Sequence, residues 1–132
     1  MMTTVDGLMY YHYIFKTYNG KSCLLYQEFK EKLGSEFQQI ATDKGFELIA
    51  HSVLEDHVHL LVKQGSEDTT NYVMRMFKGI SARRFFQKYP SNRYEYRKLW
   101  GRGYYARRIE EEELPKVVEY IRNQISANGY DK

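Results

Sequence analysis

Cysteine, long apolar runs and linker-like segments are nearly absent from this chain of 132 residues. Cys23 is the single cysteine, so a disulfide framework is excluded and a reducing, cytoplasmic environment is expected. The N-terminus lacks a charged and then apolar signal, and no apolar run is long enough to cross a membrane, so neither export nor insertion is expected. Without a Pro, Gly or Ser-rich linker, an internal repeat or a low-complexity tract, residues 1–132 are predicted to form one domain.

The modest net charge of +3 hides an uneven distribution of charge. From Arg75 to Arg108 the chain has 11 of its 20 Lys and Arg residues and one acid, Glu95, which gives a local charge of +10. The remaining 9 bases face 16 acids, which gives −7. Aromatic residues are interleaved with the bases of this basic third. Cations neutralise phosphates and aromatic rings stack on unpaired bases, so this composition is typical of a protein that binds single-stranded or hairpin nucleic acid.

Six cations of the basic third are the candidate nucleic-acid contacts: Arg75, Lys78, Arg83, Arg84, Arg102 and Arg107. On the helix expected over residues 70–88, Gly79 and Ala82 share a face with Arg75, opposite the apolar residues. Glycine inside a helix costs up to about 1 kcal/mol relative to alanine, so small residues beside bases indicate that something packs closely there. A phosphate backbone fits this face, and a solvated face with a tolerated glycine is the alternative.

Periodicity, β-rich composition and turn signals together predict a mixture of strands and helices, which is an α+β domain. Strands are expected over residues 8–18, 46–54, 57–63 and 98–108, and helices over residues 22–44, 70–88 and 115–126. The strand over residues 98–108 contains two glycines and is expected to bend. Residues 107–113 are then expected to form a charged, mobile connector to the last helix.

His57 and His59 stand in the alternating segment that runs from Val53 to Lys63. Residues two apart on a strand leave the same face of the sheet, so both imidazoles are close enough to bind one metal ion. The alternative is a half-exposed strand whose two histidines meet only water.

Tyr120 and Gln124 lie one turn apart beside the apolar stripe of the last helix. Their spacing points a tyrosine hydroxyl and a carboxamide oxygen in the same direction. For this helix taken alone, a tyrosine at the edge of the core with an incidental glutamine is the alternative interpretation.

Together these segments resemble the single-tyrosine HUH transposases of insertion sequences that move as single-stranded DNA. The resemblance is carried by H-V-H at 57–59 after an acidic turn and by Y-x-x-x-Q at 120–124, and it extends to Y-H-Y-I-F at 11–15, F-K-G at 77–79 and L-W-G-R-G-Y at 99–104. It implies a ferredoxin-like antiparallel sheet with two long helices on one face, and a C-terminal helix that carries the nucleophilic tyrosine.

The resemblance also implies an activity and its partners. Tyr120 would be the nucleophile, forming a 5′-phosphotyrosine and a free 3′-hydroxyl, and His57, His59 and Gln124 would bind Mg²⁺ or Mn²⁺. Ligand softness alone would also tolerate zinc. The expected partners are single-stranded DNA with hairpins at the ends of the element and a second copy of the chain, in a homodimer whose active sites are shared in trans.

Two other functions remain open on the sequence. One is a domesticated HUH endonuclease that acts on chromosomal repeat hairpins, although such relatives tend to have Asn-Pro where this chain has Asn123 and Gln124. The other is a non-catalytic, ferredoxin-like nucleic-acid-binding protein. No role is assigned to His12 in the first strand, and His51 is at most an indirect support of the metal site.

Overall fold

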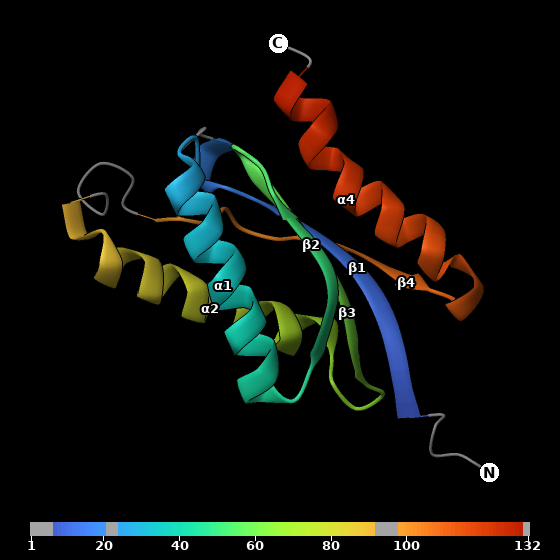
Figure 1. The fold of residues 1–132 in the computed structure, drawn as a ribbon. Coiled ribbons are helices and arrows are strands. Elements are labelled where there is room, and N and C mark those ends of the chain that lie inside the picture. Colours follow the sequence, from blue (N-terminus) through green and yellow to red (C-terminus); the bar gives the residue numbers. More distant parts are fainter. Residues whose placement is uncertain (1–6, 21–23, 92–97, 131–132) are drawn as a thin grey trace.

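The computed structural model describes residues 7–20, 24–91 and 98–130 (Figure 1). Cys23, Arg93, Tyr94, Glu95, Tyr96 and Arg97, which the sequence analysis counted, lie outside these residues. In chain order the elements are β1 (Leu8–Lys16), η2 (Tyr18–Gly20), α1 (Gln27–Lys44), β2 (Glu47–Val53), β3 (His57–Gly65), α2 (Thr70–Lys88), β4 (Tyr105–Ile109), η3 (Glu111–Glu113) and α4 (Leu114–Tyr130), where η2 and η3 are short 3₁₀ turns.

The four strands of the described chain form one antiparallel sheet in the order β2-β3-β1-β4. With α1 between β1 and β2, and α2 between β3 and β4, this is the ferredoxin-like arrangement. The predicted α+β class is therefore confirmed, and the H-V-H strand lies in the interior of the sheet beside β1.

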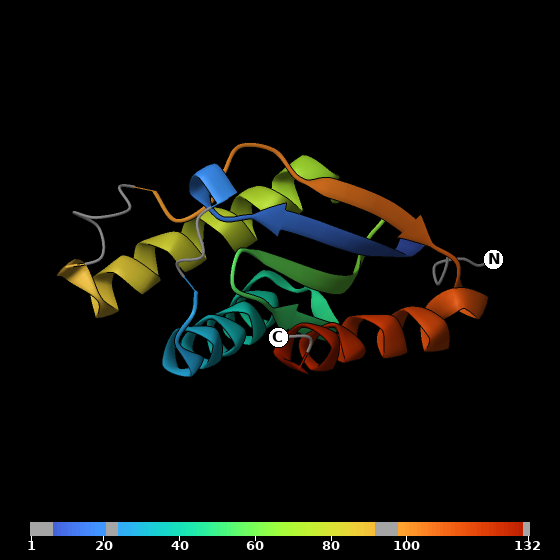
Figure 2. The same ribbon diagram turned by 90° about the horizontal axis from the view of Figure 1, so that it is seen from above.

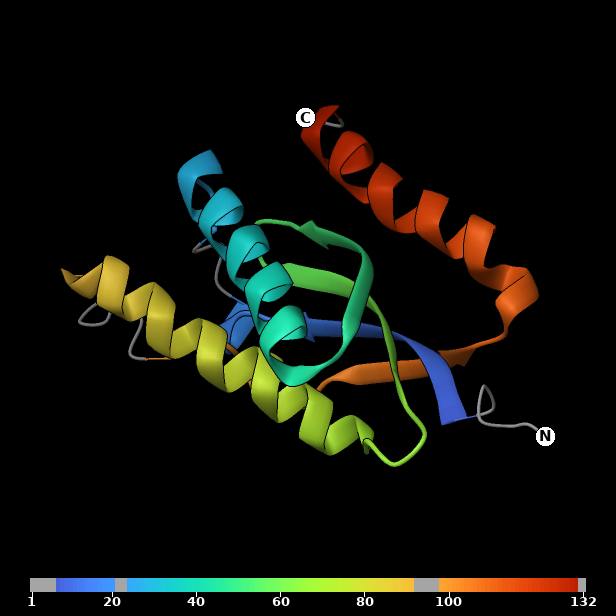
Figure 3. The ribbon, with the colours of Figure 1, turned by 60° about the horizontal axis from the view of Figure 1, so that its bottom comes forward.

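One face of the sheet is covered by α1 and α2, which cross over it in Figure 3. Strand residues that face these helices are apolar and buried, among them Tyr13, Phe15 and Leu60. Phe37 of α1 joins the layers, because its ring lies 5.9 Å from that of Phe15 and 6.1 Å from that of Phe77. This face forms the main hydrophobic core.

The opposite face is covered by α4, which Figures 1 and 2 show on the far side of the sheet from α2 and beside β2. Val117 and Ile121 of α4 pack there on Leu61 and Ile109 in a second, smaller core. The middle strand β3 is therefore covered on both faces, and His59 on its α4 side is 2% exposed.

Predicted and observed elements differ most after α2. Strand β4 contains only five residues, and Trp100 meets the first strand through an isolated bridge to Thr17. The Nζ of Lys78 donates to the carbonyls of Gly101 and Gly103, at 2.9 and 2.7 Å, and so anchors the loop that precedes β4. This loop replaces the first half of the strand predicted over residues 98–108.

The separate connector predicted over residues 107–113 is instead the end of a strand followed by a 3₁₀ turn. Arg107 to Ile109 pair with β1 as part of β4, and η3 follows at once. Glu110 and Glu113 form a capping box, in which the Glu113 carboxylate accepts from the Glu110 backbone N–H at 2.9 Å. An ion pair from Arg107 to Glu113 at 3.3 Å further ties this segment to the sheet. The described part of the chain has no helix long and apolar enough to cross a membrane.

The central place of Phe37 gives a test of the fold. Phe37 is fully buried, so Phe37→Ala is expected to lower the free energy of unfolding by about 3–5 kcal/mol, because it leaves a cavity among three aromatic rings. Urea unfolding followed by circular dichroism measures the loss. Leu25→Ala, at a side chain that is 55% exposed, is the control and is expected to change stability by less than about 0.5 kcal/mol. Similar losses in the two variants would contradict this packing.

Candidate functional site

Three histidines gather on the face of the sheet that α4 covers. The register of β1 and β3 places His12 opposite Leu61 and Ile14 opposite His59. Side chains directly opposite one another point to the same face, so His12 and His59 are diagonal neighbours. Their ring centroids are 5.2 Å apart, and those of His57 and His59 are 5.1 Å apart.

Each histidine of the H-V-H pair is held through its Nδ1 atom. Nδ1 of His57 lies 2.8 Å from Oδ1 of Asp56, and Nδ1 of His59 lies 3.0 Å from Nε2 of His12. Nε2 of His59 is buried and has no hydrogen-bond partner among the described residues, and the same holds for Oγ of Ser52 on the neighbouring strand. A buried polar atom without a partner is uncommon in native structures, and a bound ion or water is one explanation for it.

Burial controls the charge of two of these rings. Burial, with a smaller effect of Arg107, lowers the pKa of His12 to about 4. Burial, followed by the neighbouring His12 and His57, lowers the pKa of His59 to about 4. Both imidazoles are therefore neutral at pH 7, which is the form that binds metal ions.

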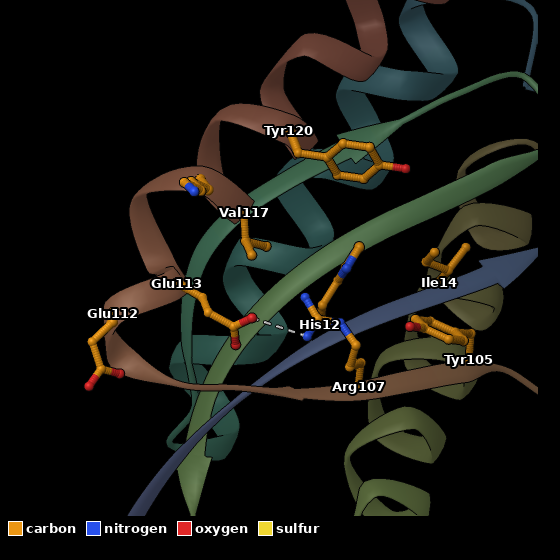
Figure 4. A pocket seen from close by; sticks show the side chains of 9 residues that line it. His12, Ile14, Tyr105, Arg107, Glu112, Glu113, Val117 and Tyr120 are labelled. Carbon is orange, nitrogen blue, oxygen red and sulfur yellow. Dashed lines mark hydrogen bonds and ion pairs between the residues drawn. The ribbon is translucent and has the colours of Figure 1, made fainter.

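Tyr120 reaches this cluster from α4. The packing of Val117 and Ile121 on the sheet fixes the helix, and Tyr120 lies between them at the edge of the contact with 50% of its surface exposed. Its ring centroid is 5.8 Å from that of His59 and 6.1 Å from that of His12. Figure 4 shows the tyrosine ring extending from α4 across the strands. Histidines and tyrosine belong to the same chain, so the arrangement in this structure is cis.

The donor set fits a divalent cation in part. His57 and His59 present two imidazoles, and the buried Nε2 of His59 has no other partner among the described residues. Gln124, the third predicted ligand, instead donates from Nε2 to the backbone carbonyl of Tyr120 at 3.3 Å. Within residues 7–20, 24–91 and 98–130, no group of three or more His, Cys, Asp or Glu side chains could hold a metal ion.

His12 is the site residue that sequence analysis left without a role. The sequence did contain a signal for His12. Its neighbours Tyr11 and Tyr13 belong to the opposite, apolar face of the strand, so alternation places His12 on the face of the H-V-H pair. His51 is excluded from the site. A Cβ atom on Gly34 of α1 would meet Nε2 of His51 at 2.9 Å, so His51 points to the α1 and α2 face.

A cavity of about 570 Å³ opens beside the tyrosine. It lies between β1, β4 and the first turns of α4, and its lining residues are drawn in Figure 4: His12, Ile14, Tyr105, Arg107, Glu112, Glu113, Lys116, Val117 and Tyr120. The volume is within the range of ligand pockets. The candidate nucleophile and His12 therefore face a space large enough for part of a nucleic-acid strand.

Three of the six predicted nucleic-acid contacts have partners inside the protein. Lys78 holds the loop before β4, Arg84 pairs with Glu36 at 2.9 Å, and Arg107 pairs with Glu113. Arg84 therefore links α2 to α1, and burial lowers the pKa of Lys78. Sequence alone does not separate such cations from solvent-facing ones.

The other three predicted contacts, Arg75, Arg83 and Arg102, are exposed. Arg83 borders a second cavity, of about 500 Å³, between α2 and residues 98–101. Gly79, Lys98 and Trp100 also line it, and a Cβ atom on Gly79 would meet nothing within 4 Å. Packing within the chain therefore does not require a glycine at position 79. The face of α2 that carries Gly79 and Ala82 stays open beside cationic side chains.

Comparison with known proteins identifies the family. Residues 6–124 match the family described as "Transposase IS200 like". The ISDra2 transposase TnpA of Deinococcus radiodurans is 31% identical over 106 residues, which cover 76% of this chain and 74% of that protein.

Two solved structures share the fold. One is the crystal structure of a protein of Deinococcus radiodurans classed as a transposase, with a TM-score of 0.74 and 28% identity over 94% of this chain and 96% of that one. The other is a REP-associated tyrosine transposase bound to a REP hairpin, with a TM-score of 0.68 and 18% identity over 92% of this chain and 69% of that one. With its ferredoxin-like sheet, its H-V-H strand and the tyrosine of its last helix, the chain belongs to the single-tyrosine, IS200-like transposase family.

Proposed function

We propose that this transposase cleaves and rejoins single-stranded DNA at hairpins, with Tyr120 as the nucleophile and a divalent cation, Mg²⁺ or Mn²⁺, at His57 and His59. The observation that supports this most directly is the contact of Tyr120 with His59 from a distant part of the sequence, with 5.8 Å between the two ring centroids. A protein that only binds nucleic acid has no need for a half-exposed tyrosine against the buried histidines His12 and His59.

The chemistry follows from the side chains. The Tyr120 oxygen attacks the scissile phosphorus and its proton passes to solvent, while the bond from phosphorus to the 3′ oxygen breaks and the 3′ oxygen takes up a proton from solvent. The products are a 5′-phosphotyrosine and a 3′-hydroxyl. When bound, the cation would orient the phosphate and stabilise its developing charge. Attack by a 3′-hydroxyl on the phosphotyrosine reverses these bonds and releases Tyr120, so the strand is rejoined without a nucleotide cofactor.

His57 and His59 would hold the cation through Nε2, since their Nδ1 atoms are already engaged. Gln124 would join them after its amide turns from the Tyr120 carbonyl toward the histidines. The hairpin substrate is supported by the fold shared with a REP-associated transposase that was solved with a REP hairpin. A domesticated endonuclease would share this chemistry, and it would differ in cutting chromosomal repeats and not the ends of an element.

Covalent capture tests the proposal. Wild-type protein incubated with hairpin-forming single strands from its own flanking DNA and Mg²⁺ is expected to form a covalent adduct, seen as a band shift under denaturing conditions and mapped by mass spectrometry to Tyr120. Tyr120→Phe keeps the ring packing and is expected to bind the hairpin without forming an adduct. Tyr105→Phe, at another half-exposed tyrosine of the same cavity, is the matched control and should retain the adduct.

The same assay tests the cation. Chelation, His57→Ala and His59→Ala are each expected to remove the adduct, whereas His51→Ala on the other face of the sheet should keep it. Because His59 is buried, thermal unfolding must show that each variant is folded before the result is read. An adduct on a different tyrosine, or one formed by folded His59→Ala protein at the wild-type rate, would contradict the proposal.

Adjacent arginines on α2 test the DNA-binding surface. Arg83 is exposed at the second cavity, whereas Arg84 is engaged by Glu36. Arg83→Ala is expected to weaken binding to all hairpin sequences alike and to reduce the slope of log affinity against log salt by about one unit. Arg84→Ala should change this slope less, and its main effect is expected to be on thermal stability. Fluorescence anisotropy at several salt concentrations measures both, and equal slopes for wild type and Arg83→Ala would place the DNA elsewhere.

Subunit mixing tests the arrangement of a homodimer. We predict sites shared in trans, in which α4 leaves its own sheet and makes the same contacts on the identical face of the partner. Heterodimers of Tyr120→Phe and His59→Ala chains would then regain one complete site and form the adduct. If confirmed heterodimers form none, each chain uses its own tyrosine, as in the single-chain structure.

A further inference from the structure

The contact between His12 and His59 is a buried polar pair that the proposed chemistry does not use. His12 is 6% exposed and His59 is 2% exposed, and Nε2 of the first lies 3.0 Å from Nδ1 of the second. The two residues come from different strands and are brought together by the register of β1 and β3. Buried side-chain polar pairs restrict both rings, because each ring loses its partner if the other turns.

A hydrogen bond between two ring nitrogens needs one proton between them. If the proton is on Nδ1 of His59, that ring donates to His12 and its Nε2 keeps a lone pair. If the proton is on Nε2 of His12, a neutral His59 has its own proton on Nε2. This N–H would be buried without an acceptor among the described residues, and buried N–H groups of this kind are rare. The first arrangement is therefore favoured.

The favoured arrangement matches that of the other histidine. His57 is held at Nδ1 by Asp56, and His59 is held at Nδ1 by His12. In both rings Nε2 is the nitrogen that remains for a ligand. Histidines that bind metal ions generally donate their other N–H to a fixed acceptor, which sets the tautomer and the orientation of the ring.

We propose that His12 is a positioning residue of the cation site: its Nε2 accepts the Nδ1 proton of His59 and so directs the lone pair of His59 Nε2 toward the cation. This role of His12 rests on the proposed function in one respect only, namely that the ligand of the site is a divalent cation. His12 itself is not a ligand in this arrangement, because the nitrogen nearest to His59 is occupied by the hydrogen bond. The role is separate from that of Tyr120, whose ring lies against both histidines.

Two variants separate positioning from packing. His12→Phe keeps an aromatic ring at this position of β1, the strand between β3 and β4, and removes the nitrogen that accepts the hydrogen bond from His59. His12→Gln places a carbonyl oxygen at about the reach of the original Nε2 and restores an acceptor. His51→Phe is the matched control, since it makes the same chemical change on the same sheet but on the face of α1 and α2. Thermal unfolding of the metal-free variants reports their folding.

The first measurement is nitrogen NMR of the histidine rings in the full-length, metal-free protein. His59 is expected as the Nδ1–H tautomer in wild type, in His12→Gln and in His51→Phe, and as the Nε2–H tautomer or a mixture in His12→Phe. A purely structural role of His12 would not set the tautomer of His59. An Nε2–H tautomer of His59 in folded wild-type protein would overturn the proposal.

The second measurement is Mn²⁺ affinity without DNA, from the electron paramagnetic resonance signal of free Mn²⁺. His12→Phe is expected to weaken binding about ten- to a hundredfold, as loss of such supporting partners does, and His12→Gln is expected to recover most of it. Equal affinities of wild type and His12→Phe, or equal losses in the Phe and Gln variants, would overturn the proposal. Wild-type protein that binds Mn²⁺ with the expected tautomer yet forms no DNA adduct would refute the proposed function and leave this role of His12 standing.

Discussion

The antiparallel pairing of β1 with β3 is the constraint on which the rest of the structure depends. It places His12 diagonally opposite His59 on one face and aligns Tyr13 and Phe15 with Leu60 and Val58 on the other. A shift of one residue would exchange the two faces, burying imidazoles in the main core and exposing aromatic rings. The large apolar core under α1 and α2 therefore fixes the geometry of the histidines, although it does not touch them.

The last helix completes this geometry from the other side. Its small apolar contact, in which Val117 and Ile121 pack on Leu61 and Ile109, holds Tyr120 against His59 at the rim of a cavity. The short, capped turn after β4 sets where α4 begins. The identical sheet of a second chain could offer α4 the same small contact. The structure of one chain is therefore physically compatible with the proposed exchange of α4 between two chains.

The basic third of the sequence divides into two sets of cations. One set, with Lys78, Arg84 and Arg107, is engaged by carbonyls or carboxylates and holds α2, α1 and β4 in place. The other set, with Arg75, Arg83 and Arg102, is exposed, and Arg83 borders the same cavity as Gly79. Electrostatic attraction of nucleic acid depends on both, because charge acts over several ångströms. Direct phosphate contacts are expected from exposed cations such as Arg83, which has no such structural role to keep.

The sequence by itself determined the class of fold, the H-V-H strand, the bounds of α2 and the helix that carries Tyr120, because periodicity is a local property of the chain. It also carried the family, which the comparisons confirm. Only the tertiary structure decided that His12 contacts His59, that His51 lies on the other face, that His59 is buried and that residues 107–113 form a strand end and a 3₁₀ turn. Each of these depends on strand register, on a bulge between Leu48 and Ala50 or on the packing of α4, and these are contacts between segments far apart in the chain.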